Sequence, residues 1–283
     1  DGVDVYPVST IQELFLHLLG EASLPLIDRS AFQYIHVPQG GEDSNMAYIK
    51  GQEYAKRALE IAAAGGHNAL LNGPPGSGKT MLARTFITIL PRMSKDEILE
   101  VTKIYSIAGM LPQGSAVMIH RPFRAPHHSA SSAALVGGGS VPRPGEVTLA
   151  HRGILFLDEL PEFPRTALEN LRQPIEDGMV TISRAQATLT FPASFTLIAA
   201  QNPCPCGFAS DPDKECACPQ GAIERYKSRV SGPILDRIDL QIEVPRLQFS
   251  KIAEAVDAER SETILERVER CREIQRQRFS DAL

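Results

Sequence analysis

Residues 73–80 form a glycine-rich loop whose residue types suit the binding of phosphate groups. They read Gly-Pro-Pro-Gly-Ser-Gly-Lys-Thr and match the pattern G-x-x-x-x-G-K-[ST] in full. In such a loop the backbone N–H groups turn inward around the phosphates, and the N-terminus of the following helix adds partial positive charge. We expect Lys79 to reach the β- and γ-phosphates of ATP and Thr80 to ligate Mg²⁺. The predicted nucleotide-binding residues here are Gly73, Pro74, Pro75, Gly76, Ser77, Gly78, Lys79, Thr80 and Met81.

Two acidic residues follow a short apolar segment, Ile154-Leu-Phe-Leu157, and could complete this site. Phosphoryl transfer depends mainly on positioning and on charge neutralisation. We predict that Asp158 holds the Mg²⁺ ion, through water, and that Glu159 polarises the attacking water. An acidic turn that is merely solvated is the alternative, but the phosphate-binding loop favours the catalytic interpretation.

Asn202 follows a second apolar segment, residues 195–200. An asparagine at the tip of a strand beside the Asp-Glu strand can hydrogen-bond the γ-phosphate or its water, so we include Asn202 among the catalytic candidates. It could instead cap the next turn, because Asn-Pro often starts turns.

Four cysteines gather in a short segment rich in Pro and Gly. Cys204-x-Cys206 and Cys216-x-Cys218 supply the four ligands that a closed Zn²⁺ site needs. The C-x-C spacing is less diagnostic than C-x-x-C, and a loop with free thiols is the alternative. Cys271 lies on an apolar helix face and is expected in the core.

The segments around these residues alternate between strand, loop and helix patterns. The apolar strands indicate a parallel sheet covered by helices on both faces, an α/β fold. Residues 179–191 alternate like a β-hairpin, and Ser94 with Glu97 forms a capping box. The expected strands are residues 68–71, 154–157 and 195–200, and the expected helices are 52–64, 79–90, 94–107 and 164–176.

The chain divides by pattern into three parts. Residues 1–47 are expected to be a leading linker segment, with a short helix over 11–19 capped by Ser9. Residues 48–245 form the predicted α/β core, and residues 246–283 begin a small C-terminal helical lid. Two inserts interrupt the core, at about 109–150 and 179–191.

Composition restricts the possible settings. The net charge of −5 excludes nucleic-acid coating by bulk charge, so any such contact must be local. No segment approaches the roughly twenty apolar residues of a membrane helix, and five cysteines suggest a reducing, cytoplasmic location. Because the chain begins with Asp1, we expect it to be a piece of a longer protein.

These features together resemble the AAA+ ATPases, and more closely the magnesium-chelatase-related group often called ComM or YifB. The likeness covers about residues 47–280. The segments that carry it are Lys50–Ala58, Ala62–Asn68, the phosphate-binding loop, Arg121–His128, Gly137–Ser140, Pro144–Glu146, Leu157–Phe163, Leu171–Pro174, Asn202–Gly207 and Ser231–Asp239.

The resemblance implies a five-stranded α/β domain, a helical lid, and homo-oligomeric rings, usually hexamers, with ATP between subunits. It places Arg237 at the position of an arginine finger that acts on the neighbour's site, with Arg229 as a second candidate. A surface ion pair of Arg237 with Asp236 or Asp239 is the alternative from the residues alone. The segment Ile49–Gln52, which contains Gly51, resembles the part that packs on adenine. The sensor-2 region expected in relatives lies beyond this sequence.

The two inserts resemble elements that point into the pore of such rings. Arg121, Arg124, Arg143 and Arg184 could line a positive channel for a DNA backbone, or could simply be scattered surface arginines. His127 and His128 are expected to pack or to act in a pore loop rather than to bind metal.

The leading functional hypothesis is an ATP-hydrolysing AAA+ ring motor that acts on branched or single-stranded DNA. It is most similar to the branch-migration helicases of natural transformation. A magnesium-chelatase-like metal-insertion motor and an ATP-gated assembly scaffold are the competing hypotheses. Stimulation of the ATPase by branched DNA, rather than by a porphyrin with partner subunits, separates the first two.

Overall fold

The computed structural model describes residues 4, 6–26, 44–111, 117–138, 143–184, 187–209, 211, 213–247 and 258–280, without the side chains of 183, 184, 187 and 280. The chain divides into two units, residues 1–38 and 39–283. In the first unit, helix α1 (Ile11–Leu18) begins after Thr10, whose Oγ1 accepts a hydrogen bond from the Glu13 amide. The cap is therefore Thr10 rather than Ser9. Ser9 contributes its amide instead, which donates to the Glu13 carboxylate.

A five-stranded parallel sheet forms the centre of the second unit, as predicted. Leu71 of β1 lies in register with Ala200 of β8 on one side and with Ile242 of β9 on the other. Because all the strands run the same way, their carboxyl ends meet along one edge. The strand order is β2 (Phe123–Arg124), β5 (Ile154–Leu157), β8 (Thr196–Gln201), β1 (Ala69–Asn72) and β9 (Leu240–Glu243).

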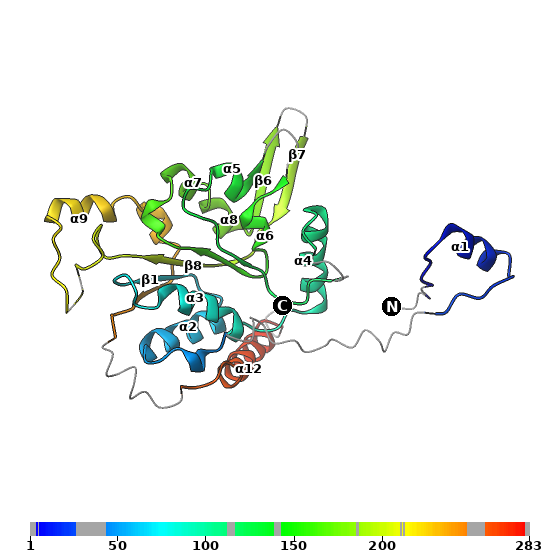
Figure 1. Ribbon diagram of the computed structural model, residues 1–283, viewed down its shortest axis with the longest axis horizontal. Coiled ribbons are helices and arrows are strands. Elements are labelled where there is room, and N and C mark those ends of the chain that lie inside the picture. Colours follow the sequence, from blue (N-terminus) through cyan, green and yellow to red (C-terminus); the bar gives the residue numbers. More distant parts are fainter. Residues whose placement is uncertain are drawn as a thin grey trace. The chain divides into compact units, whose positions relative to one another are not determined.

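Helices cover both faces of this sheet (Figure 1). Alternate strand residues point to opposite faces, so Leu71 and Phe156 pack on one side and Leu70 and Leu155 on the other. The first side carries α2 (Glu53–Gly65), α3 (Lys79–Phe86), η3 (Ile87–Ile89) and α12 (Ser261–Ser280). The second carries α5 (Ser132–Val136), α6 (Glu146–Leu149), α7 (Arg165–Glu169), α8 (Arg172–Asp177) and the hairpin β6 (Met179–Arg184)–β7 (Ala187–Pro192).

Local signals explain where several helices begin and end. Ser94 and Glu97 make the predicted capping box at the start of α4 (Lys95–Ile107). The helix expected over 164–176 is instead two helices, α7 and α8. A continuous helix is disfavoured because Pro174 has no N–H to donate to the carbonyl of Asn170. In such a helix the proline ring would also clash with that carbonyl.

The long insert expected at 109–150 contains short elements where it is described. They include the edge strand β2, helices α5 and α6, and the antiparallel pair β3 (Gly137–Gly138)–β4 (Arg143–Pro144). The remaining elements are η2 (Met46–Tyr48), η4 (Leu160–Glu162), α9 (Gln220–Lys227) and α10 (Gly232–Leu235). Within the described residues, none of the helices is both long and apolar enough to cross a bilayer.

Helix α12, in the segment predicted to begin a lid, packs against α2 and η3. Ile264 and Val268 are buried in the same core as the sheet, whereas Cys271 is only half-buried and Ile274 is exposed. The expected apolar helix face is therefore buried only in its first half. The assignment of residues 246–283 to a separate subdomain stays a prediction, and residues 248–257 lie outside the described part of the chain.

Candidate nucleotide site

The carboxyl edge of the sheet brings together residues that lie far apart in the sequence. The phosphate-binding loop, residues 73–80, follows β1, the two acids follow β5, and Asn202 follows β8, which lies between those strands. The loop is joined to β8 at its first residue, because the Gly73 amide donates a 3.2 Å hydrogen bond to the Gln201 carbonyl. Three separate sequence predictions therefore converge on one place.

The shape of the loop depends on its glycines. Gly76 and Gly78 have φ angles of 75° and 94°, in the left-handed region that other residues adopt only with strain. A Cβ on Gly73 would lie 2.1 Å from the Val244 carbonyl oxygen, so no larger residue fits there. The Ser77 hydroxyl is buried and has no hydrogen-bond partner among the described residues. The loop is thus a tight backbone turn with an unpaired polar atom.

Lys79 places its ammonium group within this turn. Its Nζ donates to the carbonyls of Gly73 and Pro74, at 2.6 and 2.9 Å, and to Asn202 Oδ1 at 3.1 Å. Only 8% of the residue is exposed. Desolvation lowers the pKa of Lys79, and the charges of Asp158 and Glu159 oppose that shift. A desolvated ammonium at a helix N-terminus is suited to pairing with phosphate oxygens.

Thr80 and Asp158 supply the oxygen atoms for a metal ion. The Thr80 hydroxyl donates a 2.8 Å hydrogen bond to Asp158 Oδ2, while Asp158 Oδ1 accepts from the Glu159 amide at 3.0 Å. A hydroxyl and a carboxylate side by side are hard ligands of the kind that Mg²⁺ prefers. These two residues therefore fit the predicted Mg²⁺ site.

Glu159 has a partner that the sequence did not identify. Its Oε2 lies 3.1 Å from His128 Nδ1, and its φ of 53° places it in the left-handed region. The His128 ring also lies 4.0 Å from the centroid of His127 and meets the edge of Phe163. His128 comes shortly after β2, and β2 pairs with β5, which explains how it reaches an acid after β5. It thus packs against other rings, as expected, and also contacts the predicted catalytic acid, which was not expected.

The segment predicted to pack on adenine lies beside the phosphate-binding loop. Gln52 Nε2 donates to the carbonyls of Ser77, at 3.2 Å, and Pro245, at 2.6 Å. Ile49 is buried, and a Cβ on Gly51 would lie 2.8 Å from Leu247 Cδ1. Gln52 ends the segment expected to pack on adenine, whereas Leu247 was not predicted as a site residue. Met81, on the first turn of α3, is half-exposed beside the loop.

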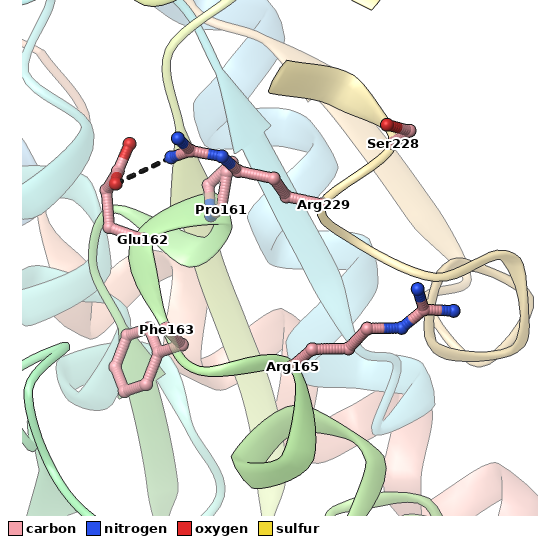
Figure 2. Close-up of a pocket in the computed structure, with 6 residues that line it drawn as sticks. All are labelled: Pro161, Glu162, Phe163, Arg165, Ser228 and Arg229. Carbon is pink, nitrogen blue, oxygen red and sulfur yellow. Dashed lines mark hydrogen bonds and ion pairs between the residues drawn. The ribbon is translucent and has the colours of Figure 1, made fainter. Parts of the chain in front are cut away.

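The two predicted arginine fingers are held within their own chain. Arg237 is ion-paired with Glu176, rather than with Asp236 or Asp239, and donates to the Pro233 carbonyl. Arg229 donates a 2.7 Å hydrogen bond to Glu162. Both residues line a pocket of about 500 Å³. Figure 2 shows the Arg229 side chain extending toward Glu162, whereas the side chain of Arg165 extends away from it. Their action on a neighbouring subunit stays a prediction.

The arginines considered for a DNA channel divide into different classes. Arg121 has only 11% of its side chain exposed, and it donates hydrogen bonds to the carbonyls of Pro91, Arg92 and Arg152 and to Glu97. Arg124 makes two hydrogen bonds to the carboxylate of Glu146. Both side chains are therefore engaged in contacts within their own chain, and a channel role for them stays a prediction. Arg143 is exposed, and the side chain of Arg184 lies outside the described residues.

The four cysteines of the loop between β8 and α9 meet in space. All four sulfur atoms lie within 4.8 Å of one another. Cys204 Sγ is 3.4 Å from Cys206 Sγ and 3.7 Å from Cys216 Sγ, and the latter two are 3.6 Å apart. A tetrahedral Zn²⁺ site with bonds of about 2.3 Å would separate its sulfurs by about 3.8 Å, whereas a disulfide needs about 2.05 Å. The spacing fits a metal site.

One thiol of this cluster ionises more readily than an ordinary cysteine. A hydrogen bond from the Phe208 backbone amide is the main cause that lowers the pKa of the Cys206 thiol to about 6. Desolvation opposes this shift, and hydrogen bonds with the neighbouring thiols contribute to it. The thiolate is the form of cysteine that binds metal ions. Cys204 is fully buried beside it, and the other three are half-buried. Despite a hydrogen bond from the Cys218 amide, desolvation and the neighbouring thiols raise the pKa of Cys216 to about 12, and the pKa of Cys218 is also raised. The cluster therefore has ligands of the right number and spacing, and one of them ionises readily.

Comparisons with known proteins indicate the family of this chain. A family model described as "Magnesium chelatase, subunit ChlI" matches residues 45–252. Competence protein ComM of Haemophilus influenzae is 45% identical over 97% of this chain and 54% of its own length, and YifB of Escherichia coli is 48% identical over 82% and 45%. The Magnesium-chelatase 67 kDa subunit of Chlorobaculum parvum is 28% identical over 55% and 23%.

This chain thus spans about half the length of ComM and YifB. The family model covers the sheet, the phosphate-binding loop, both acids and the cysteine cluster. By that match, and by its relation to ComM and YifB, the chain belongs to the magnesium chelatase subunit ChlI family of AAA+ ATPases.

Proposed function

We propose that this protein is an ATP-hydrolysing ring motor that acts on DNA, most like a branch-migration helicase of natural transformation. The observation that carries the ATPase part is the assembly of Lys79, Thr80, Asp158 and Asn202 at one edge of the sheet. The DNA part is supported by the name of the 45% identical relative, Competence protein ComM.

Each side chain of the site has a separate proposed role in ATP hydrolysis. Lys79 would leave the carbonyls of Gly73 and Pro74 for the phosphate oxygens, and Asn202, its third partner, would contact the γ-phosphate or the attacking water. Thr80 and Asp158 would hold Mg²⁺, which supplies charge neutralisation to the phosphates. Glu159 would orient the water and accept its proton after exchanging its contact with His128.

We propose that the active form is a ring, hexameric by the family resemblance, with each site completed by an arginine of the neighbour. Arg237 is the first candidate because the family motif places it there, and its own-chain pair with Glu176 would open on assembly. Arg229, with about half of its side chain exposed, is the second. An arginine supplied in trans neutralises charge that develops in the transition state.

A metal-insertion motor is the competing function. It is supported by the description of the matching family and by the 28% identical magnesium-chelatase subunit of Chlorobaculum parvum. The higher identity to ComM favours the DNA motor. An ATP-gated scaffold that binds nucleotide without hydrolysing it is the third candidate.

One experiment separates these functions. The ATPase rate of the full-length protein is measured alone, with four-way DNA, with single-stranded DNA, and with a porphyrin and partner subunits. Stimulation by DNA, together with strand exchange of a labelled four-way junction, supports the proposal. Stimulation only by the porphyrin mixture supports metal insertion, and nucleotide binding without turnover supports the scaffold.

We further propose Zn²⁺ as the occupant of the four-cysteine cluster, because four sulfur ligands at tetrahedral spacing are typical of structural zinc sites. Reduced thiols of this kind are maintained in the cytoplasm, where we place the protein. Elemental analysis of the purified protein should find one zinc per chain, and a Cys216→Ser/Cys218→Ser variant should lose it. A zinc-free wild type purified under reducing conditions would contradict this assignment.

A further inference from the structure

The cysteine cluster lies next to the nucleotide site, and the chain that forms it touches the phosphate-binding loop at several points. We infer that the metal-filled cluster positions this loop, so that occupancy of the cysteines controls the affinity for nucleotide. The inference rests on the proposed ATPase site and adds a metal-dependent control to it.

The first contact is between Gly207 and Pro75. A Cβ on Gly207 would lie 2.5 Å from Pro75 Cδ and 2.7 Å from Pro75 Cγ, which is closer than any Cβ contact tolerates. Gly207 has a φ of 85°, and its amide donates to the Cys204 carbonyl at 2.9 Å. Gly207 directly follows Cys206 in the chain. A metal ion bound to Cys206 would therefore restrain Gly207, which packs against Pro75.

The second contact is on the other side of Cys204. Asn202, two residues before that cysteine, accepts the 3.1 Å hydrogen bond from Lys79 Nζ. Gln201 accepts the hydrogen bond from the Gly73 amide. The short segment from Gln201 to Gly207 therefore meets the phosphate-binding loop at its first residue, at Pro75 and at its lysine.

Strand β8 holds the start of this segment, and the loop that follows Cys204 has few restraints besides the cysteines among the described residues. Two of them are the pair of Arg246 with Asp211, at 3.9 Å, and the stacking of Lys214 on the Phe208 ring. The described residues between Asn202 and Pro219 contain neither helix nor strand. Binding one ion to Cys204, Cys206, Cys216 and Cys218 would close a loop of about ten residues, and such a cross-link reduces the conformations open to the chain as a disulfide does. With the ion removed, Gly207 would lose that restraint, and Asn202 would be held only from the side of β8.

The consequence falls on nucleotide affinity. Part of the binding energy of a loop that is not already ordered is spent on ordering it. A cluster that holds Pro75 and the lysine partner in place removes that cost before ATP arrives. Loss of metal or oxidation of the thiols should therefore weaken nucleotide binding, without any change in the residues that contact the phosphates.

The test uses the full-length protein and two kinds of variant. Cys216→Ser/Cys218→Ser removes two ligands far along the chain from Asn202, and Gly207→Ala alters the Pro75 contact while it keeps all four cysteines. Cys271→Ser, on the half-exposed part of α12, is the matched control. The measurements are zinc content, the dissociation constant for a fluorescent ADP analogue, and amide hydrogen exchange of residues 73–80 without nucleotide.

We expect the double variant to lose zinc and to bind the ADP analogue at least tenfold more weakly. The amide hydrogens of residues 73–80 should also exchange faster in this variant. Gly207→Ala should keep zinc and still bind at least threefold more weakly, and Cys271→Ser should match the wild type. Zinc loss with unchanged affinity and exchange would overturn the inference. If the double variant does not fold, the Gly207→Ala variant provides the test. A nucleotide affinity of Gly207→Ala equal to that of the wild type would also overturn the inference.

Failure of the proposed function gives a different result. A wild-type protein that holds zinc but binds no nucleotide would refute the ATPase site itself. A wild type that binds nucleotide and hydrolyses it, with affinity indifferent to zinc, would leave the ATPase intact and refute only the metal control.

Discussion

Thr80 Oγ1 lies 2.8 Å from Asp158 Oδ2, although the two residues are 78 positions apart in the chain. The contact joins the first turn of α3 to the end of β5, and it places a hydroxyl and a carboxylate where one Mg²⁺ ion could bind both. We expect Thr80→Ala to require at least tenfold more Mg²⁺ for half-maximal ATPase activity. Thr80→Ser keeps the hydroxyl and should restore the wild-type requirement, whereas an unchanged Mg²⁺ dependence in Thr80→Ala would contradict the assigned role.

Replacing Lys79 by alanine removes the only described ammonium group within the phosphate-binding loop. Because charge-assisted hydrogen bonds to phosphate are strong, we expect nucleotide affinity to fall at least about 100-fold, which is roughly 2.7 kcal/mol. Isothermal titration with ADP measures this. Lys103→Ala, an exposed lysine on α4, is the control and should bind normally. The fold should survive, since desolvation disfavours the charged form of Lys79 in the unliganded chain.

Glu159→Gln should separate binding from turnover. The amide cannot accept a proton from water, but it has nearly the same shape as the carboxylate and leaves the phosphate-binding loop intact. We expect the affinity for ATP to stay within about twofold of the wild type, while turnover falls at least about 100-fold. Single-turnover hydrolysis of labelled ATP measures both. Normal turnover in this variant would show that Glu159 does not act on the water.

The two arginine candidates can be tested by mixing subunits. Arg237→Ala should reduce turnover at least about 100-fold while each chain still binds nucleotide, because the arginine would act on the neighbour. Lys79→Ala is inactive for a different reason, so mixtures of the two variants should regain part of the activity at interfaces that pair a normal loop with a normal arginine. No recovery would place Arg237 in a structural role with Glu176. The same mixtures made with Arg229→Ala test the second candidate.

The docking of α12 should depend on pH through Glu60. Arg267 donates to Glu60 at 2.7 Å, and this hydrogen bond is the main cause that lowers the pKa of Glu60 from 4.5. A carboxylate with a lowered pKa stabilises the fold above its unfolded pKa, and that contribution disappears as the pH falls through the folded value. Glu60→Gln should therefore cost about 1–2 kcal/mol near pH 7, after allowance for the partly exposed arginine, and progressively less below about pH 4.5.

Urea unfolding of the chain at several pH values measures this difference. Glu273→Gln is a matched control on the same helix, because Glu273 pairs with Arg276 on the exposed surface of α12. Such a pair contributes less than about 0.5 kcal/mol. Equal effects of the two substitutions at pH 7 would contradict a specific role for Glu60 in holding α12.

The sequence determined the parts of this protein that depend on neighbours in the chain. Short runs of apolar side chains, three residues in β1 and four in β5, located these strands. The glycine pattern of residues 73–80 located the phosphate-binding loop, since φ angles and strand burial are local requirements. The same was true of the capping box at Ser94. The edge strand β2, with two residues and one neighbour in the sheet, gave no comparable pattern.

Only the tertiary structure decided which side chains meet across strands. The contact of His128 with Glu159 follows from the pairing of β2 with β5, and the contact of Gly207 with Pro75 follows from the position of β8 beside β1. Arg121 and Arg124 look like surface cations in the sequence, but their acidic partners are 24 and 22 residues away. The pairing of distant segments is set by how the whole sheet and its helices bury their apolar faces, and no local pattern of residues carries that information.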